Sequence, residues 1–191
     1  MSLIEIRQVD AHTRLGLGRI DAAEDLTARQ RERKTVEGLL HAMTGNGALT
    51  IGHEPSGKPF VDVASGCAAQ VAAPMHISIS HTRGYAVLML SSDEVLGVDI
   101  EYRSDRVERI ASRFIGPDEP ACTTDEKLLV WSAKETVYKL FSADNLMFMD
   151  MRVHSIHEHY LCVENLKRHI VVDVFYEFTD DYVLTYAVLP A

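Results

Sequence analysis

The chain has 191 residues, 47% of them hydrophobic and 25% charged, a balance typical of a folded globular protein and not of a disordered one. Its formal net charge of −9 argues against nucleic acid as the main partner. The N-terminal stretch is charged and carries no apolar run, so we expect a cytoplasmic protein without a membrane span. The three cysteines are too scattered for a disulfide framework or a zinc site, and they are Cys67, Cys122 and Cys162.

The first half of the chain carries one clear helix pattern among several strand patterns. Between residues 26 and 43, apolar side chains recur at i, i+3, i+4 and i+7, and the segment Gly45-Asn46-Gly47 predicts the end of this helix. Residues 61–74 are rich in Ala, Gly and Ser and predict a loop. Alternating apolar residues predict strands at 3–9, 49–53, 75–80, 85–91 and 95–101.

The second half predicts two helices followed by strands. A short helix is expected over residues 107–114, and the longest helix over 124–141, where Thr123 and Glu126 form a T-x-x-E capping box. The last third reads as a meander of antiparallel strands at 160–163, 169–178 and 182–189. The fold class is therefore α+β, with a main helix and several strands in each half.

The segment Gly97-Val98-Asp99-Ile100-Glu101 lies on a predicted strand. Side chains alternate along a strand, so Asp99 and Glu101 share one face and lie about 7 Å apart. Two carboxylates in that position repel each other unless water or a cation separates their charges. Taken alone, the pattern is more typical of a solvated strand face than of a site.

A second segment, Trp131-Ser132-Ala133-Lys134-Glu135-Thr136-Val137-Tyr138-Lys139, lies on the longest predicted helix. Glu135 and Lys139 are four residues apart, which favours a surface salt bridge, and Trp131 one turn earlier has the character of a core aromatic. Two shorter segments are Gly57-Lys58-Pro59, a turn, and Ile77-Ser78-Ile79-Ser80-His81-Thr82, a strand that ends in a histidine. Each pattern alone has an ordinary structural interpretation.

Together and in this order, the segments GKP, ISHT, GVDIE and WSAKETVYK resemble the 4'-phosphopantetheinyl transferase superfamily. The resemblance runs from Gly57 to Lys139 and is to the two-halved form similar to the surfactin-synthetase activator. It implies a pseudo-two-fold pair of α/β halves with coenzyme A in the cleft between them. The halves would be residues 1–93, with GKP and ISHT, and residues 94–191, with GVDIE and WSAKE.

The resemblance also implies roles for individual residues. Asp99, Glu101 and Glu135 would bind Mg²⁺, which prefers oxygen ligands. Lys139 would bind phosphate, and Glu135 would act as the general base, directly or through a metal-bound water. Glu119 would be an assisting carboxylate; neighbouring Asp118 is an alternative to Glu119, and a third interpretation is that both are solvated. Coenzyme A would be bound by Lys58, Pro59, Ser80 and His81.

The activity implied is transfer of the 4'-phosphopantetheine arm of coenzyme A to a serine of an apo acyl or peptidyl carrier protein, with release of 3',5'-ADP. The expected partners are coenzyme A and the carrier. A monomer is expected, because two similar halves within one chain remove the need for several subunits to form the site. Carrier proteins are acidic, so a local basic surface is needed, and a cluster at residues 29–34 is either such a surface or a solvated helix face.

Three other functions fit parts of the sequence. One is a non-catalytic homologue that binds coenzyme A or a carrier protein without transfer. Another is a different Mg²⁺-dependent phosphoryl-transfer enzyme, although no G-x-x-x-x-G-K-[ST] segment is found in the sequence. The third is a purely structural α+β domain. The sequence does not identify the carrier.

Overall fold

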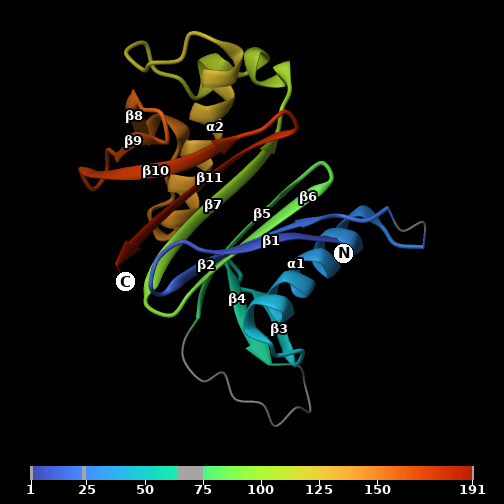
Figure 1. The fold of residues 1–191 in the computed structure, drawn as a ribbon. Helices are drawn as coiled ribbons and strands as arrows, with labels where there is room; N and C mark the ends of the chain where they lie inside the picture. Colours follow the sequence, from blue (N-terminus) through green and yellow to red (C-terminus); the bar gives the residue numbers. More distant parts are fainter. Residues whose placement is uncertain (1, 23–24, 64–74, 191) are drawn as a thin grey trace. The chain divides into compact units, whose positions relative to one another are not determined.

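The structure is a computed structural model that describes residues 2–22, 25–63 and 75–190. The chain divides into two compact units, residues 1–96 with 189–191, and residues 97–188. Each unit combines a β-sheet with one long α-helix (Figure 1), which confirms the α+β class. The division falls three residues after the predicted boundary between residues 93 and 94.

A four-stranded antiparallel sheet forms the framework of the first unit, in the order β1-β2-β6-β5. Its strands are β1 (Ser2–Gln8), β2 (Thr13–Arg19), β5 (His76–Thr82) and β6 (Tyr85–Ser91). A separate hairpin pairs β3 (Leu49–His53) with β4 (Pro59–Val63). Residues 61–63 belong to β4, so the predicted loop is wrong there, and residues 64–74, with Cys67, lie outside the described residues.

Helix α1 (Ala28–Thr44) packs on this sheet with the predicted apolar stripe. Its start is fixed by a capping box, in which the Thr27 hydroxyl accepts from the Gln30 backbone N–H and the Gln30 side chain accepts from that of Thr27. Gly45 ends the helix with φ of +69°, a left-handed conformation that favours glycine. The buried stripe consists of Val36, Leu39, Leu40 and Met43.

Strand β2 was not predicted from the sequence, because glycines interrupt its apolar pattern. A Cβ on Gly16 would stand 2.7 Å from Met43 Sδ, and a Cβ on Gly18 would stand 3.3 Å from Leu39 Cδ2. The glycines therefore let α1 lie directly on the strand. The absence of side chains at these two positions interrupts the apolar pattern of β2 and is also what its packing against α1 requires.

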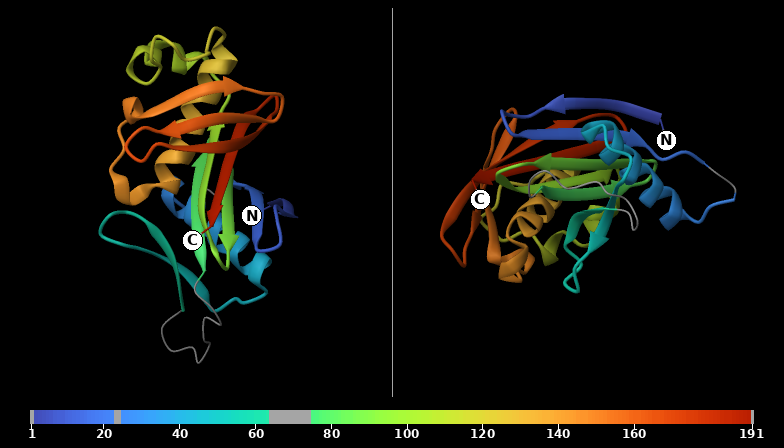
Figure 2. Two further views of the ribbon diagram at one scale, coloured as in Figure 1. Left: turned by 90° about the vertical axis from the view of Figure 1, so that its left-hand side faces the viewer. Right: turned by 90° about the horizontal axis from the view of Figure 1, so that it is seen from below.

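The second unit is built on a five-stranded sheet in the order β7-β11-β10-β9-β8. Helix α2 (Thr124–Leu140) packs along it, as two views of the ribbon show (Figures 1 and 2). Strand β8 was not predicted, and the predicted helix at 107–114 consists of two short 3₁₀ turns, η1 (Asp105–Arg109) and η2 (Ala111–Arg113). The strands are β7 (Glu94–Tyr102), β8 (Met151–Ile156), β9 (Tyr160–Asn165), β10 (Ile170–Phe178) and β11 (Tyr182–Pro190).

Strand β7 and helix α2 come into direct backbone contact at Gly97. A Cβ there would stand only 2.3 Å from the Thr136 carbonyl oxygen. This approach brings the acidic side chains of β7 next to the polar face of α2. Within the described part of the chain, no helix has both the length and the apolar character needed to cross a membrane.

Candidate functional site

Asp99 lies at the centre of the candidate site, on β7, and only 4% of its surface is exposed. Its Oδ2 accepts a hydrogen bond of 2.8 Å from the Ser132 hydroxyl, and its Oδ1 accepts one of 2.8 Å from the Lys139 ammonium. Both donors come from α2. A solvated strand face is therefore the wrong interpretation of Asp99, because this carboxylate is buried between the strand and the helix.

Glu101, two residues farther along β7, is half-buried and accepts a 2.8 Å hydrogen bond from the indole N–H of Trp131. Burial raises the pKa of Glu101, and the negative charge of Asp99 raises it further. The Trp131 hydrogen bond and the Lys139 charge act in the opposite direction. The ionised form of Glu101 is therefore stabilised by Trp131 and Lys139 against the effect of burial and of Asp99.

Glu135 on α2 is the third carboxylate of the site, and Asp99, Glu101 and Glu135 are called the acidic group below. Burial, followed by the charge of Asp99, raises the pKa of Glu135 to about 7, while Lys139 opposes the shift and Glu101 adds to it. Among the described residues, none donates a hydrogen bond to the Glu135 carboxylate. Its oxygens are therefore available to a proton, a cation or a substrate group.

Lys139 does not form the salt bridge with Glu135 that their spacing favours. Its ammonium reaches across to β7, where it donates to Asp99 Oδ1 and to the Val98 carbonyl oxygen, each at 2.8 Å. The helical i,i+4 interpretation is wrong for this pair, because a buried carboxylate on another element offers the ammonium a stronger partner. Lys139 is thereby fixed at the acidic group.

The donor chemistry of Asp99, Glu101 and Glu135 fits a hard divalent cation. Their carboxylate oxygens are the ligands that Mg²⁺ prefers, and a cation among them would offset the repulsion that, after burial, raises the pKa of Glu101 and Glu135. In the described parts of the chain, no three His, Cys, Asp or Glu side chains already enclose a metal position. Binding would therefore require side-chain rotation at this site.

Glu119 occupies a different environment from the one predicted for an assisting carboxylate. It forms an ion pair of 2.8 Å with Lys134, and it accepts backbone hydrogen bonds from Gly116 and Val153 at 2.6 and 2.7 Å. Its side chain is only 4% exposed. These contacts fill both of its oxygens and include no residue of the acidic group, so they give no support to a role in proton transfer.

The residues predicted to bind coenzyme A lie in the first unit. Lys58 is exposed at the turn of the β3–β4 hairpin, and half-buried Pro59 begins β4, which lies next to β5. On β5, Ser80 is buried, whereas His81 is exposed with Nδ1 3.6 Å from Glu32 Oε1 on α1. Their role toward coenzyme A stays a prediction.

One arginine of the basic cluster on α1 is paired with a carboxylate of the same helix, and another bonds to the backbone before it. Arg33 pairs with Glu37 at 2.9 Å, and Arg31 donates to the Leu26 carbonyl oxygen at 3.1 Å. Arg29 and Lys34 are exposed to solvent.

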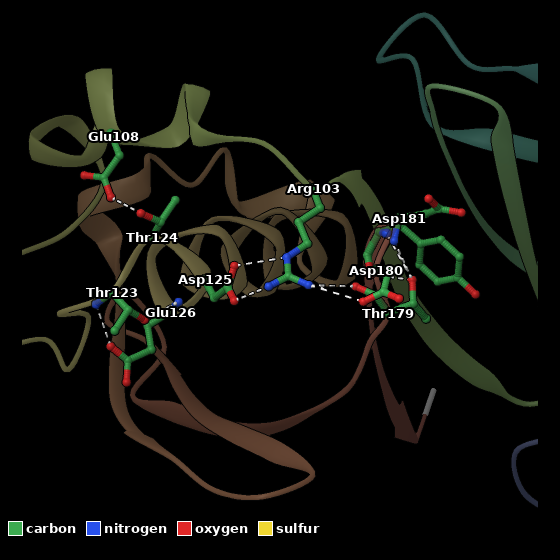
Figure 3. A network of polar contacts seen from close by, with 10 residues as sticks. Arg103, Glu108, Thr123, Thr124, Asp125, Glu126, Thr179, Asp180 and Asp181 are labelled. Carbon is green, nitrogen blue, oxygen red and sulfur yellow. Dashed lines mark hydrogen bonds and ion pairs between the residues drawn. The ribbon is translucent and has the colours of Figure 1, made fainter.

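Arg103, which the sequence interpretation missed, links three elements of the second unit (Figure 3). Its guanidinium donates to both carboxylate oxygens of Asp125 in the first turn of α2, at 3.2 and 2.5 Å, and to the Thr179 carbonyl oxygen at 3.3 Å. It also stacks over the Phe178 ring at 5.0 Å. Arg103 follows β7 directly, so it ties the end of the strand to the start of the helix.

Comparison with protein families gives one match. The family model of the 4'-phosphopantetheinyl transferase superfamily matches residues 95–187, from β7 to β11. The matched segment contains the whole acidic group and Lys139, and it confirms the superfamily inferred from the sequence. No curated protein matches the chain. Residues 95–187 are therefore similar to the 4'-phosphopantetheinyl transferase superfamily.

Proposed function

We propose that this protein transfers the 4'-phosphopantetheine arm of coenzyme A to a serine of an apo acyl or peptidyl carrier protein and releases 3',5'-ADP. One observation carries the proposal: in the segment that matches the superfamily, Asp99, Glu101 and Glu135 interact electrostatically beside the fixed ammonium of Lys139. Phosphopantetheine transfer is the reaction for which the superfamily is named.

In this proposal, Asp99, Glu101 and Glu135 hold one Mg²⁺ ion. When bound, the ion would neutralise charge on the pyrophosphate of coenzyme A. Asp99 is suited to be the fixed ligand because Ser132 and Lys139 already hold both of its oxygens in place. Glu101 and Glu135 are less enclosed and would complete the ligand set by rotating toward the ion.

Glu135 is the proposed general base. Among the described residues, none donates a hydrogen bond to its carboxylate, so an oxygen is available to take a proton from a serine hydroxyl. The serine oxygen then bonds to the β-phosphorus as the bond from that phosphorus to the ADP oxygen breaks. The serine proton goes to Glu135.

Lys139 is the proposed electrostatic partner of the leaving group. Its ammonium carries three donors, of which Asp99 and the Val98 carbonyl use two. The third can point to a phosphate oxygen of coenzyme A and stabilise the charge that develops on departing 3',5'-ADP.

Three finer points belong to the same proposal. Lys58, Pro59, Ser80 and His81 would bind the nucleotide part of coenzyme A. The two halves would be related by a pseudo-two-fold axis, with coenzyme A between them, and the protein would act as a monomer. A charge-complementary surface would attract the acidic carrier.

The test is to incubate the purified protein with coenzyme A, MgCl₂ and a panel of apo carrier proteins, and to measure carrier mass. We expect a gain of one phosphopantetheine group that EDTA abolishes. Glu101→Gln and Lys139→Ala should each lower transfer by orders of magnitude with unchanged far-UV circular dichroism, whereas Glu108→Gln, outside the acidic group, should retain it. Near-wild-type transfer by both site variants would refute the site assignment. Binding of coenzyme A without transfer to any carrier would favour the non-catalytic homologue.

A further inference from the structure

Lys134 is a fully buried lysine that the proposed reaction does not use. Its side chain has no exposed surface, and its ammonium lies 2.8 Å from Glu119. It also donates to the Phe114 carbonyl oxygen at 2.6 Å and to the Phe148 carbonyl oxygen at 3.3 Å. The ammonium thus has three acceptors, one for each of its protons.

The two carbonyl groups that Lys134 holds belong to residues whose rings pack on Trp131. The Phe148 ring stacks on the indole, with centroids 4.6 Å apart and planes at 28°. The Phe114 ring meets the indole edge-on, with centroids 5.1 Å apart and planes at 76°. One ammonium therefore contacts the backbone of both phenylalanines whose rings pack against the indole.

The indole in turn orients a carboxylate of the acidic group. The Trp131 N–H donates to Glu101 Oε1 at 2.8 Å. Lys134 and Trp131 lie on the same helix, three residues apart, while Phe114 follows η2 and Phe148 begins a 3₁₀ turn before β8. Three separate segments therefore converge on the residue that holds Glu101.

We propose that the Lys134–Glu119 ion pair is a positioning element for the site: it sets the orientation of Trp131 through Phe114 and Phe148, and thereby the orientation of the Glu101 carboxylate. Glu119 thus contributes to the reaction through another residue and does not exchange protons with the substrate. The catalytic part of this inference rests on the proposed function.

The energetics of buried charges support a positioning role over a purely stabilising one. Removing an ammonium and a carboxylate from water costs free energy that their attraction recovers only in part, and apolar residues of similar volume often serve stability as well or better. The pair at Lys134 and Glu119 instead satisfies four backbone groups: the N–H groups of Gly116 and Val153, and the carbonyls of both phenylalanines. This arrangement fixes geometry at several segments at once.

Trp131 is the chain's single tryptophan, so its fluorescence reports on this arrangement directly. The experiment compares wild-type protein, Lys134→Met and the double variant Lys134→Met/Glu119→Gln, which leaves no uncompensated buried charge. In metal-free protein, we expect both variants to show emission at longer wavelength and stronger quenching by acrylamide. The matched control is Lys127→Met on the same helix, which breaks the half-exposed pair with Glu108 and should leave the emission unchanged.

The catalytic readout is transfer to a carrier protein with a separate kcat and KM. Misplacing Glu101 should lower kcat by about a hundredfold in the double variant, with KM for coenzyme A little changed. Adding Trp131→Phe should cost little more, because both changes act on the same hydrogen bond.

The outcomes distinguish this inference from the proposed function. Unchanged Trp131 emission and quenching in a folded double variant would overturn the positioning role, whatever the activity. Altered fluorescence with kcat as in wild type would also overturn it, since Glu101 would then function without the pair. If the wild-type protein transfers nothing to any carrier, the proposed function fails, while the fluorescence comparison still decides whether Lys134 and Glu119 orient Trp131.

Discussion

Lys139 on α2 bonds to Asp99 on β7, with Nζ 2.8 Å from Oδ1, and leaves Glu135 on its own helix without an ion pair to it. The Lys139 ammonium is therefore used by the most buried carboxylate of the acidic group. Asp99 is thereby held in place, while Glu135 has no ion pair with Lys139 and its pKa is raised to about 7, first by burial and then by the charge of Asp99.

The first prediction concerns this ion pair. Lys139→Met keeps the length of the side chain and removes the charge, so Asp99 loses its ion pair while the Ser132 hydrogen bond stays in place. We expect the free energy of unfolding to fall by about 2 kcal/mol at pH 7, measured in urea, because a buried charged acceptor loses its main donor. Lys139→Arg, which retains a charged donor, should recover part of that loss. Equal stability of Lys139→Met and wild type would mean that the ammonium lies in solvent.

The second prediction concerns pH and Glu135 in metal-free protein. Its pKa is raised from 4.5 to about 7, so the folded state binds more protons than the unfolded state between these values. Stability from this group is therefore complete below pH 4.5 and is lost as pH rises through 7, a difference of up to about 3 kcal/mol. Glu135→Gln cannot ionise, so it should be more stable than wild type at pH 8 and similar at pH 4.5. Parallel urea profiles at both pH values would contradict the raised pKa.

The third prediction concerns the glycine of GVDIE. A methyl group at position 97 would stand 2.3 Å from the Thr136 backbone oxygen, which cannot move aside as a flexible side chain could. Gly97→Ala should lower the free energy of unfolding by about 3 kcal/mol. Gly47→Ala is the matched control, because no atom lies within 4 Å of its added Cβ. An equally small effect of both substitutions would show that β7 and α2 do not approach this closely.

The fourth prediction concerns Arg103. Arg103→Lys keeps the charge but loses the planar fork that contacts Asp125 and the Thr179 carbonyl together. We expect a loss of about 1 kcal/mol in urea unfolding, since the pair is partly exposed and only its geometry is removed. Asp125→Asn should give a similar loss alone, and little further loss when combined with Arg103→Lys. Full additivity of the two substitutions would exclude a shared interaction.

Most of the fold follows from local patterns. Helix α1 shows its apolar stripe and its terminal glycine in the sequence, and α2 begins at the predicted box of Thr123 and Glu126. Strand β2 was not predicted because Gly16 and Gly18 interrupt its apolar pattern. These glycines are needed for the close packing of α1 on the strand, which local sequence does not reveal. The two 3₁₀ turns after β7 share short-range spacing with an α-helix, so the helix predicted there had the right position but the wrong type.

Less of the candidate site could be predicted. The ordered motifs pointed to Asp99, Glu101, Glu135 and Lys139, and the structure brings these four residues together. The partner of Lys139 could not be inferred, because spacing along the helix favours Glu135 and only the close approach at Gly97 makes Asp99 reachable. The Lys134–Glu119 pair could not be predicted from the sequence either, since a buried ion pair between two separate segments leaves no periodic pattern.

Both long helices begin at a capping box, Thr27 with Gln30 and Thr123 with Glu126. Each box is complete within four consecutive residues, so the capping hydrogen bonds of both helices form locally. The sheets are different, because β2 pairs with β6 from Thr13↔Ser91 onward and β7 lies next to β11. Such pairings close long loops, which slows folding. We therefore expect the pairing of these strands, and not the formation of either helix, to limit how fast a newly made chain reaches its native state.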